Sequence, residues 1–107
     1  MAVISLPQAV EQFVSATNAH DADALLAMFA PEAVVVDDGA TFATEAELRE
    51  FIKVQIVAPK VVLTVISSEA DRLLASGDGE FPGGPLTFAF TFTTKGNLIT
   101  HLSVELA

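Results

Sequence analysis

Apolar residues in the first half of the chain recur at the spacing of three and four that marks one face of a helix. The first helix is expected over residues 6–18, where Val10 and Phe13 follow this spacing. Asp21 is a favourable N-cap for a second, short helix, which we expect Pro31 to end. The pattern therefore predicts two consecutive helices before any strand.

A third helix is expected where Thr44 and Glu47 have the spacing of a capping box. Leu48 and Phe51 then lie on one face of this helix, and Pro59 stops it. The helix is separated from the second one by a short run of valines and by an Asp-Asp-Gly sequence that is typical of a turn.

The remaining segments are rich in β-branched and aromatic residues and are too short or too regularly alternating for helices. The clearest alternation places Phe88, Phe90 and Phe92 on one side of a strand and threonines on most of the other. Strands are expected over residues 33–37, 60–68, 71–81, 86–94 and 98–106, with a tight turn at 95–97.

The resulting order is helix, helix, strand, helix and then four strands in an antiparallel meander. Helices early and strands late predict an α+β fold in which the helices cover one face of a sheet. A chain of 107 residues makes one such domain, spanning residues 1–107. The alternation in the last strands suits a curved sheet whose concave face meets the helices, which leaves the other face partly wet or free for dimerisation.

Composition excludes several classes of partner. The net charge is −9 and the five basic residues do not cluster, which argues against nucleic acid and against anionic membranes. No apolar run approaches the ~20 residues of a membrane span, and the first residues lack the basic region of a signal peptide. The chain has no cysteine, so it has no disulfide or thiolate chemistry. We expect a soluble cytoplasmic protein.

Asp37 is the first candidate for chemistry, and it has two interpretations. It can be a carboxylate that faces a pocket at the end of a strand, or it can be a turn residue bonded to its own backbone. Asp38 points the other way if the strand persists, so we expect it to be exposed or to form the turn. The choice between these interpretations of Asp37 decides whether the chain has an acid–base group.

His101 is the second candidate, and it is expected on the same face of its strand as Ser103 and Glu105. A lone histidine in a strand is often structural, but His101 could also face Asp37 and form an acid–base pair with it. His20 is expected to be a solvated linker residue. The spacing of the two histidines gives no metal motif, and no glycine-rich phosphate loop or Ser-His-Asp arrangement is present. We expect neither a metal nor a cofactor.

The residues also carry a family resemblance. Residues 9–37, AVEQFVSATNAHDADALLAMFAPEAVVVD, followed by LREF at 48–51 and more loosely by TFTTKGNLI at 91–99, resemble the nuclear transport factor two-like superfamily. Within it the chain is most similar to the ketosteroid isomerase and polyketide cyclase-like, or SnoaL-like, group. The resemblance implies a cone of a strongly curved sheet and three helices, with a pocket at the open end. It also implies a homodimer through the convex face of the sheet.

The resemblance gives several residues an expected role. Asp37 matches the general base of the ketosteroid isomerases. The tyrosine and the protonated aspartate that stabilise the enolate in those enzymes correspond to Phe13 and Phe88, which donate no hydrogen bond. The loss of such donors costs about 3 kcal/mol each, so a faithful ketosteroid isomerase is not expected. His101 is the one candidate for a replacement donor.

Two functions follow from this comparison. The first is a cofactor-independent catalyst of isomerase, cyclase or dehydratase type, with Asp37 as base and His101 as its hydrogen-bond partner. The second is a non-catalytic module that binds a small hydrophobic molecule or dimerises. In either case the ligand-binding residues implied are Phe13, Thr17, Phe51, Phe88, Phe90, Ser103 and Glu105.

Overall fold

The computed structural model describes residues 8–69, 71–80, 83–96 and 98–107. Its helices are α1 (Gln8–Asn18), α2 (Ala22–Ala27) and α3 (Glu45–Ile52), and a π-helical turn, η1 (Lys53–Val57), continues α3. Its strands are β1 (Phe29–Asp37), β2 (Ala40–Phe42), β3 (Val62–Glu69), β4 (Arg72–Asp78), β5 (Leu86–Lys95) and β6 (Leu98–Leu106). The predicted start of the first helix, the predicted end of the second late strand at residue 81 and the last residue of the predicted turn at 95–97 lie outside the described residues.

The second helix is capped as predicted but is shorter than predicted. The side chain of Asp21 accepts a hydrogen bond from the Ala24 amide at 3.1 Å. The helix ends at Ala27, and Phe29 already belongs to β1, so Pro31 does not end the helix. Pro31 instead lies exposed inside β1, where the pairing with β6 shifts register between Phe29 and Val34. A proline is tolerated there because the irregular pairing does not require its missing amide.

The predicted capping box of α3 is present in full. The Glu47 amide donates to the Thr44 hydroxyl at 3.1 Å, and the Thr44 amide donates to the Glu47 carboxylate at 3.2 Å. Hydrogen bonds from the Ala43 and Thr44 amides stabilise the ionised carboxylate and lower the pKa of Glu47. The π-helical turn carries the chain on to Val57, so the helical segment ends before Pro59 as expected.

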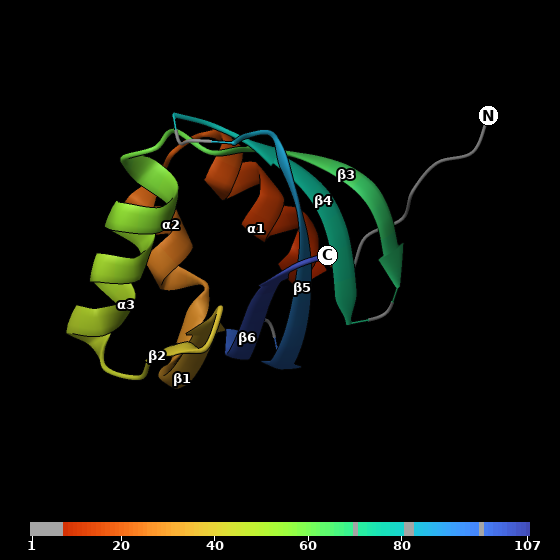
Figure 1. The fold of residues 1–107 in the computed structure, drawn as a ribbon. Coiled ribbons are helices and arrows are strands. Elements are labelled where there is room, and N and C mark those ends of the chain that lie inside the picture. Colours follow the sequence, from red (N-terminus) through yellow and green to blue (C-terminus); the bar gives the residue numbers. More distant parts are fainter. Residues whose placement is uncertain (1–7, 70, 81–82, 97) are drawn as a thin grey trace.

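The six strands form one sheet in the order β2-β1-β6-β5-β4-β3. β1 pairs with β6 in parallel and the other neighbours are antiparallel, so the sheet is mixed. Its last four strands are the predicted meander, and β2 is an additional three-residue edge strand that is too short to give a sequence pattern. Figure 1 shows the sheet curving around α1, with α2 and α3 beside it.

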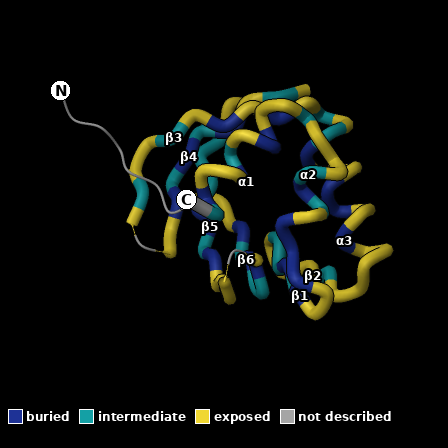
Figure 2. The backbone as a smooth tube through the Cα atoms, turned by 180° about the vertical axis from the view of Figure 1, so that it is seen from behind, coloured by how far each residue is buried: buried dark blue, intermediate teal, exposed yellow. Residues whose placement is uncertain are grey.

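Buried residues of the sheet and the helices form one core cluster on the concave side of the sheet, and Figure 2 marks the buried positions along the backbone. Paired positions such as Leu73, Phe90 and Val104 are nearly inaccessible and share the inner face. The helices contribute Phe13 and Leu25 to the same core. The α+β architecture with helices on one face of a curved sheet is therefore confirmed. No helix in the described ranges is long and apolar enough to cross a membrane.

Candidate functional site

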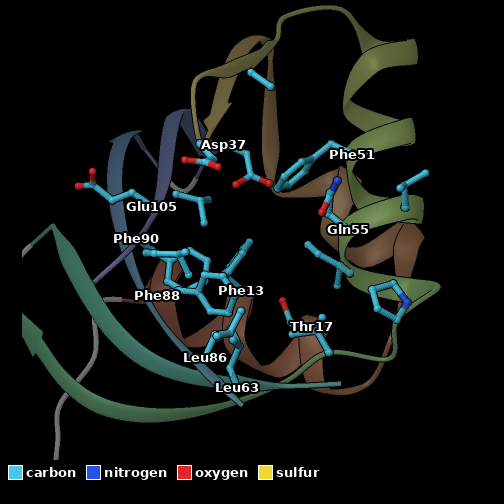
Figure 3. Close-up of a pocket in the computed structure, with 18 of the residues that line it drawn as sticks. Phe13, Thr17, Asp37, Phe51, Gln55, Leu63, Leu86, Phe88, Phe90 and Glu105 are labelled. Atoms are coloured by element: carbon cyan, nitrogen blue, oxygen red, sulfur yellow. The ribbon is translucent and has the colours of Figure 1, made fainter. Parts of the chain in front are cut away.

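A cavity of about 700 Å³ opens between the concave face of the sheet and the segment formed by α3 and η1 (Figure 3). Its wall is mostly apolar and aromatic, with carboxylates at several points. It is lined by Phe13, Thr17, Asp37, Asp38, Ala40, Phe51, Val54, Gln55, Ile56, Pro59, Val61, Leu63, Glu80, Leu86, Phe88, Phe90, Val104, Glu105 and Leu106. A pocket of this size and character is typical of a small-molecule binding site.

Asp37 reaches this cavity because it is the last residue of β1. Val35 is fully buried on the inner face, and the period of two along the strand brings Asp37 to the same face. Burial raises the pKa of the Asp37 carboxyl, and the neighbouring charge of Asp38 raises it further. The carboxyl is only half-buried and lies in the pocket wall. The strand thus delivers a carboxyl group with increased basicity to an apolar pocket.

The turn after Asp37 is the one that the Asp-Asp-Gly sequence predicted. Asp38 and Gly39 have φ angles of 49° and 86°, and Asp37 pairs with Ala40 across the hairpin. Positive φ at both central residues is the geometry of a type I′ turn, which favours Asp-Gly. Asp38 is exposed in this turn and also contributes to the pocket wall. Two adjacent carboxylates therefore stand at the same end of the cavity.

The phenylalanines of the inner face build the aromatic wall without filling the cavity. Phe13 is 1% exposed and packs edge-on against Phe92, with ring centroids 5.3 Å apart, and against Phe90 at 5.6 Å. Phe88 continues this wall with its ring 6.2 Å from that of Phe90. On the opposite side Phe51 from α3 faces the cavity (Figure 3). Phe13, Phe51, Phe88 and Phe90 all line the pocket, and space remains between them.

Two uncharged polar side chains also line the cavity, Thr17 from α1 and Gln55 from η1. Thr17 was among the expected binding residues, whereas nothing in the sequence singled out Gln55. Its position depends on the π-helical turn, which rotates the residues that follow it relative to a regular helix. Such turns occur often at functional sites, but the apolar spacing of residues 48–56 predicts a regular helix.

His101 and Ser103 do not line the cavity. The pairing of β5 with β6 shifts between Thr93 and Thr94, which leaves Thr100 as an extra residue and reverses the alternation along β6. Leu102 and Val104 consequently occupy the inner face, and His101 is half-buried beside Val34 and Thr93 on the outer face. The predicted pairing of His101 with Asp37 is therefore not formed.

Glu105 contributes to the rim of the pocket, as expected from its place near the end of the last strand. Its side chain is exposed and points away from the middle of the cavity in Figure 3. Glu80 also belongs to the lining, and its carboxylate lies 3.7 Å from the ammonium group of Lys60. Of the described residues that line the cavity, none is basic. The charged groups of the described lining are therefore carboxylates, of which that of Glu80 is paired with Lys60.

The inner end of the site is held by hydrogen bonds between α1 and β3. The Asn18 side chain donates to the Leu63 carbonyl at 3.1 Å and accepts from the Leu63 amide at 2.7 Å. His20, which was expected to be solvated, has a φ of 55° and places Nε2 3.0 Å from the Val61 carbonyl. These contacts fix the end of α1 against the strand that forms the floor of the cavity.

A mixed, curved sheet around three helices, with a cavity between the sheet and α3, is the α+β cone of the nuclear transport factor two-like class. Within this class the chain belongs to the SnoaL-like domain family, whose model matches residues 10–102. No curated protein matches the sequence.

Solved structures agree with this assignment. A Sinorhizobium meliloti protein provisionally assigned as a polyketide cyclase is 31% identical, with a TM-score of 0.82 over 94% of this chain and 95% of that one. A Catenulispora acidiphila protein with a ketosteroid isomerase-like fold, in complex with trimethylamine, is 22% identical with a TM-score of 0.79, over 96% and 88% of the two chains. A Mycobacterium tuberculosis protein in complex with estradiol-17β-hemisuccinate is 22% identical with a TM-score of 0.70, over 92% and 91%. The last two similarities concern the fold alone.

Proposed function

We propose that the chain binds a small, largely apolar molecule in this pocket and that Asp37 acts on it as an acid–base catalyst. The observation that carries the proposal is the position of Asp37, a half-buried carboxyl with a raised pKa in the wall of an aromatic cavity. A general base is most effective when its pKa approaches the working pH, and burial moves Asp37 in that direction. The reaction is of isomerase, cyclase or dehydratase type and needs no cofactor.

The chemical step is a proton transfer at a carbon next to a carbonyl group. The Asp37 carboxylate accepts the proton, and the electron pair of the C–H bond moves into the enolate. In an isomerase the protonated carboxyl returns the proton to another carbon. In a cyclase it protonates the oxygen of the carbonyl that the enolate carbon attacks, and in a dehydratase it protonates the β-hydroxyl group that leaves as water. The 31% identity to a protein provisionally assigned as a polyketide cyclase supports a ketone substrate. The steroid derivative bound by the Mycobacterium tuberculosis protein supports a flat apolar ligand.

A second function is favoured by a different observation. His101 lies outside the pocket lining. Phe13 and Phe88 line the pocket at the positions that, by the family resemblance, correspond to the enolate-stabilising donors of ketosteroid isomerases, and neither can donate a hydrogen bond. A pocket that binds a hydrophobic ligand without turning it over is consistent with these facts. The two functions share the pocket and differ in whether Asp37 moves a proton.

Exchange of carbon-bound hydrogen for deuterium distinguishes the catalytic function from binding without catalysis. The chain is incubated in D₂O with a Δ5-ketosteroid or a polyketide-like ketone, and loss of the proton next to the carbonyl is followed by NMR. We expect Asp37→Asn to slow the exchange by about 100-fold or more, which is the usual contribution of a general base. Asp38→Asn is the matched control and should retain most of the exchange. Equal exchange by the parent chain and Asp37→Asn would remove Asp37 as the base.

We further propose that the chain is a homodimer in which the outer face of the sheet is the interface. The helices cover only the inner face, so no layer from the described part of the chain packs on the outer face of β5 and β6. Residues at its centre, such as His101 and Ser103, are only half-buried.

A further inference from the structure

Thr17 is a buried polar residue whose hydroxyl has no hydrogen-bond partner among the described residues. It lies in α1 and is 1% exposed. A threonine in a helix can bond to the carbonyl four residues earlier, but Thr17 makes no such bond to Phe13. An unsatisfied buried hydroxyl costs stability, so its presence in a well-packed core requires an explanation.

The backbone groups of the segment that packs beside the end of α1 have other partners. The Leu63 amide and carbonyl both bond to the Asn18 side chain, at 2.7 and 3.1 Å. The Val61 carbonyl bonds to His20 at 3.0 Å. These bonds hold α1 against β3 and leave the Thr17 hydroxyl free at a fixed position.

The hydroxyl is directed into the cavity. Figure 3 shows the Thr17 oxygen pointing toward the middle of the pocket, with Phe13 and Leu63 beside it. The side chains beside it are apolar and offer the hydroxyl no hydrogen bond. A molecule held by the rest of the pocket can supply the polar group that pairs with Thr17.

We infer that the Thr17 hydroxyl is a ligand-binding group at the inner end of the pocket. The ligand is otherwise apolar and carries a hydroxyl or carbonyl group at the end that lies at the inner end of the pocket. The Thr17 hydroxyl forms a hydrogen bond with the oxygen of that group. Asp37 then meets the opposite end of the ligand, near the β1–β2 turn. This inference rests on the proposed pocket function and deepens it, because it defines where the ligand must carry oxygen.

The first test compares the stability of the ligand-free chain with that of Thr17→Val and Thr17→Ser. Valine has nearly the volume of threonine without the hydroxyl, so Thr17→Val should melt at the same temperature as the parent or at a higher one. Thr17→Ser keeps the hydroxyl and is the matched control for the next measurement. A lower melting temperature for Thr17→Val would show that the hydroxyl has a structural partner and would overturn the inference.

The second test measures binding of estradiol, which has an oxygen at each end, and of the analogues that lack the 3-hydroxyl or the 17-hydroxyl. We expect Thr17→Val to weaken estradiol binding about tenfold, the effect of one buried hydrogen bond. Thr17→Ser should bind estradiol within about threefold of the parent. Thr17→Val should also weaken binding of the analogue that keeps the inner oxygen. It should leave the affinity for the other analogue unchanged, and this difference isolates the interaction between the hydroxyl and that oxygen.

Three outcomes would overturn the inference. They are no binding of estradiol to the parent chain, equal binding by the parent and Thr17→Val, and an equal loss for all three ligands. The tests are independent of the catalytic proposal, since they read binding and stability whereas Asp37→Asn is read by deuterium exchange. If the parent chain shows no Asp37-dependent exchange but Thr17→Val still weakens estradiol binding, the protein binds its ligand without catalysis and the inference about Thr17 holds.

Discussion

Asp37 links the chemistry of the pocket to the stability of the fold. Its pKa in the folded chain is raised from 3.8 by burial and by Asp38, so the folded state binds the proton more tightly than the unfolded state does. The stability should therefore fall as the pH rises from 3.8 through the folded-state pKa, and the penalty is complete above that value. Basicity in the pocket is obtained at the expense of stability near neutral pH.

Substitution of Asp37 by asparagine should reverse this penalty. We expect Asp37→Asn to be more stable than the parent at neutral pH, with a difference that vanishes below 3.8, where the carboxyl is protonated in both states. Urea denaturation of both chains across this range measures the difference. Asp38→Asn should give part of the same increase in stability, because it removes the repulsion between the two carboxylates. Asparagine also tolerates the φ of 49° at this position. A parent chain that is as stable as Asp37→Asn at neutral pH would contradict the raised pKa.

The roles of Asp37 and Thr17 in the site differ in how far the sequence predicts them. The local sequence left Asp37 between a pocket and a turn, and only the family resemblance favoured the pocket. The structure shows why it lies there, because the strand period of two carries the buried face from Val35 to Asp37. The helical spacing that includes Phe13 also places Thr17 on the buried side of α1, but it does not show that the hydroxyl lacks a partner. That property depends on the bonds of Asn18 to Leu63, which join residues 45 positions apart.

At the level of elements, β4 and β5 shape the pocket through one glycine. Gly77 lies on the inner face of β4, and a Cβ atom there would stand 2.7 Å from Cε2 and 2.9 Å from Cδ2 of Phe88. Real Cβ atoms do not approach other atoms so closely, and the Phe88 ring has open cavity beside it. The glycine therefore sets how far this ring withdraws from the pocket.

Gly77→Ala should accordingly push the Phe88 ring into the cavity. We expect weaker binding of estradiol and a loss of stability of about 1–3 kcal/mol, which is the usual effect of overpacking. Fluorescence titration and thermal denaturation measure the two effects. The double variant Gly77→Ala with Phe88→Leu should recover binding because the smaller side chain relieves the contact. Unchanged affinity and stability in Gly77→Ala would show that Phe88 does not define the pocket wall.

The inner face of a strand could be predicted from the sequence where the strand pairs regularly with its neighbours. It could not be predicted where the pairing is interrupted. The alternation of Phe88, Phe90 and Phe92 indicated the inner face of β5 correctly, since the inner side of that strand is continuous. The same rule misplaced His101, because the irregularity near Thr100 depends on how β6 pairs with its neighbour. The three-residue β2 and the π-helical turn also arise from contacts that a local pattern does not encode.

At the level of the whole molecule, the charge of −9 opposes association of two copies. If the outer face of the sheet is the interface, sedimentation should show a dimer at micromolar concentration that strengthens with salt, because salt screens this repulsion. Ser103→Glu places a carboxylate on this face, beside Thr91, and should yield monomers. Gln12→Glu adds the same charge on an exposed position of α1 and is the control. A monomer for the parent chain, or a dimer for Ser103→Glu, would exclude this interface.

The carboxylates of the pocket have a consequence for which compounds can enter it. Many metabolites carry a phosphate, a carboxylate or a coenzyme A group, and each of these would approach Asp37 and Asp38 with no basic side chain among the described lining residues to offset the repulsion. We therefore expect this end of the cavity to bind neutral or cationic molecules better than anionic ones. A compound would become a better ligand of this protein once its charged carrier had been removed.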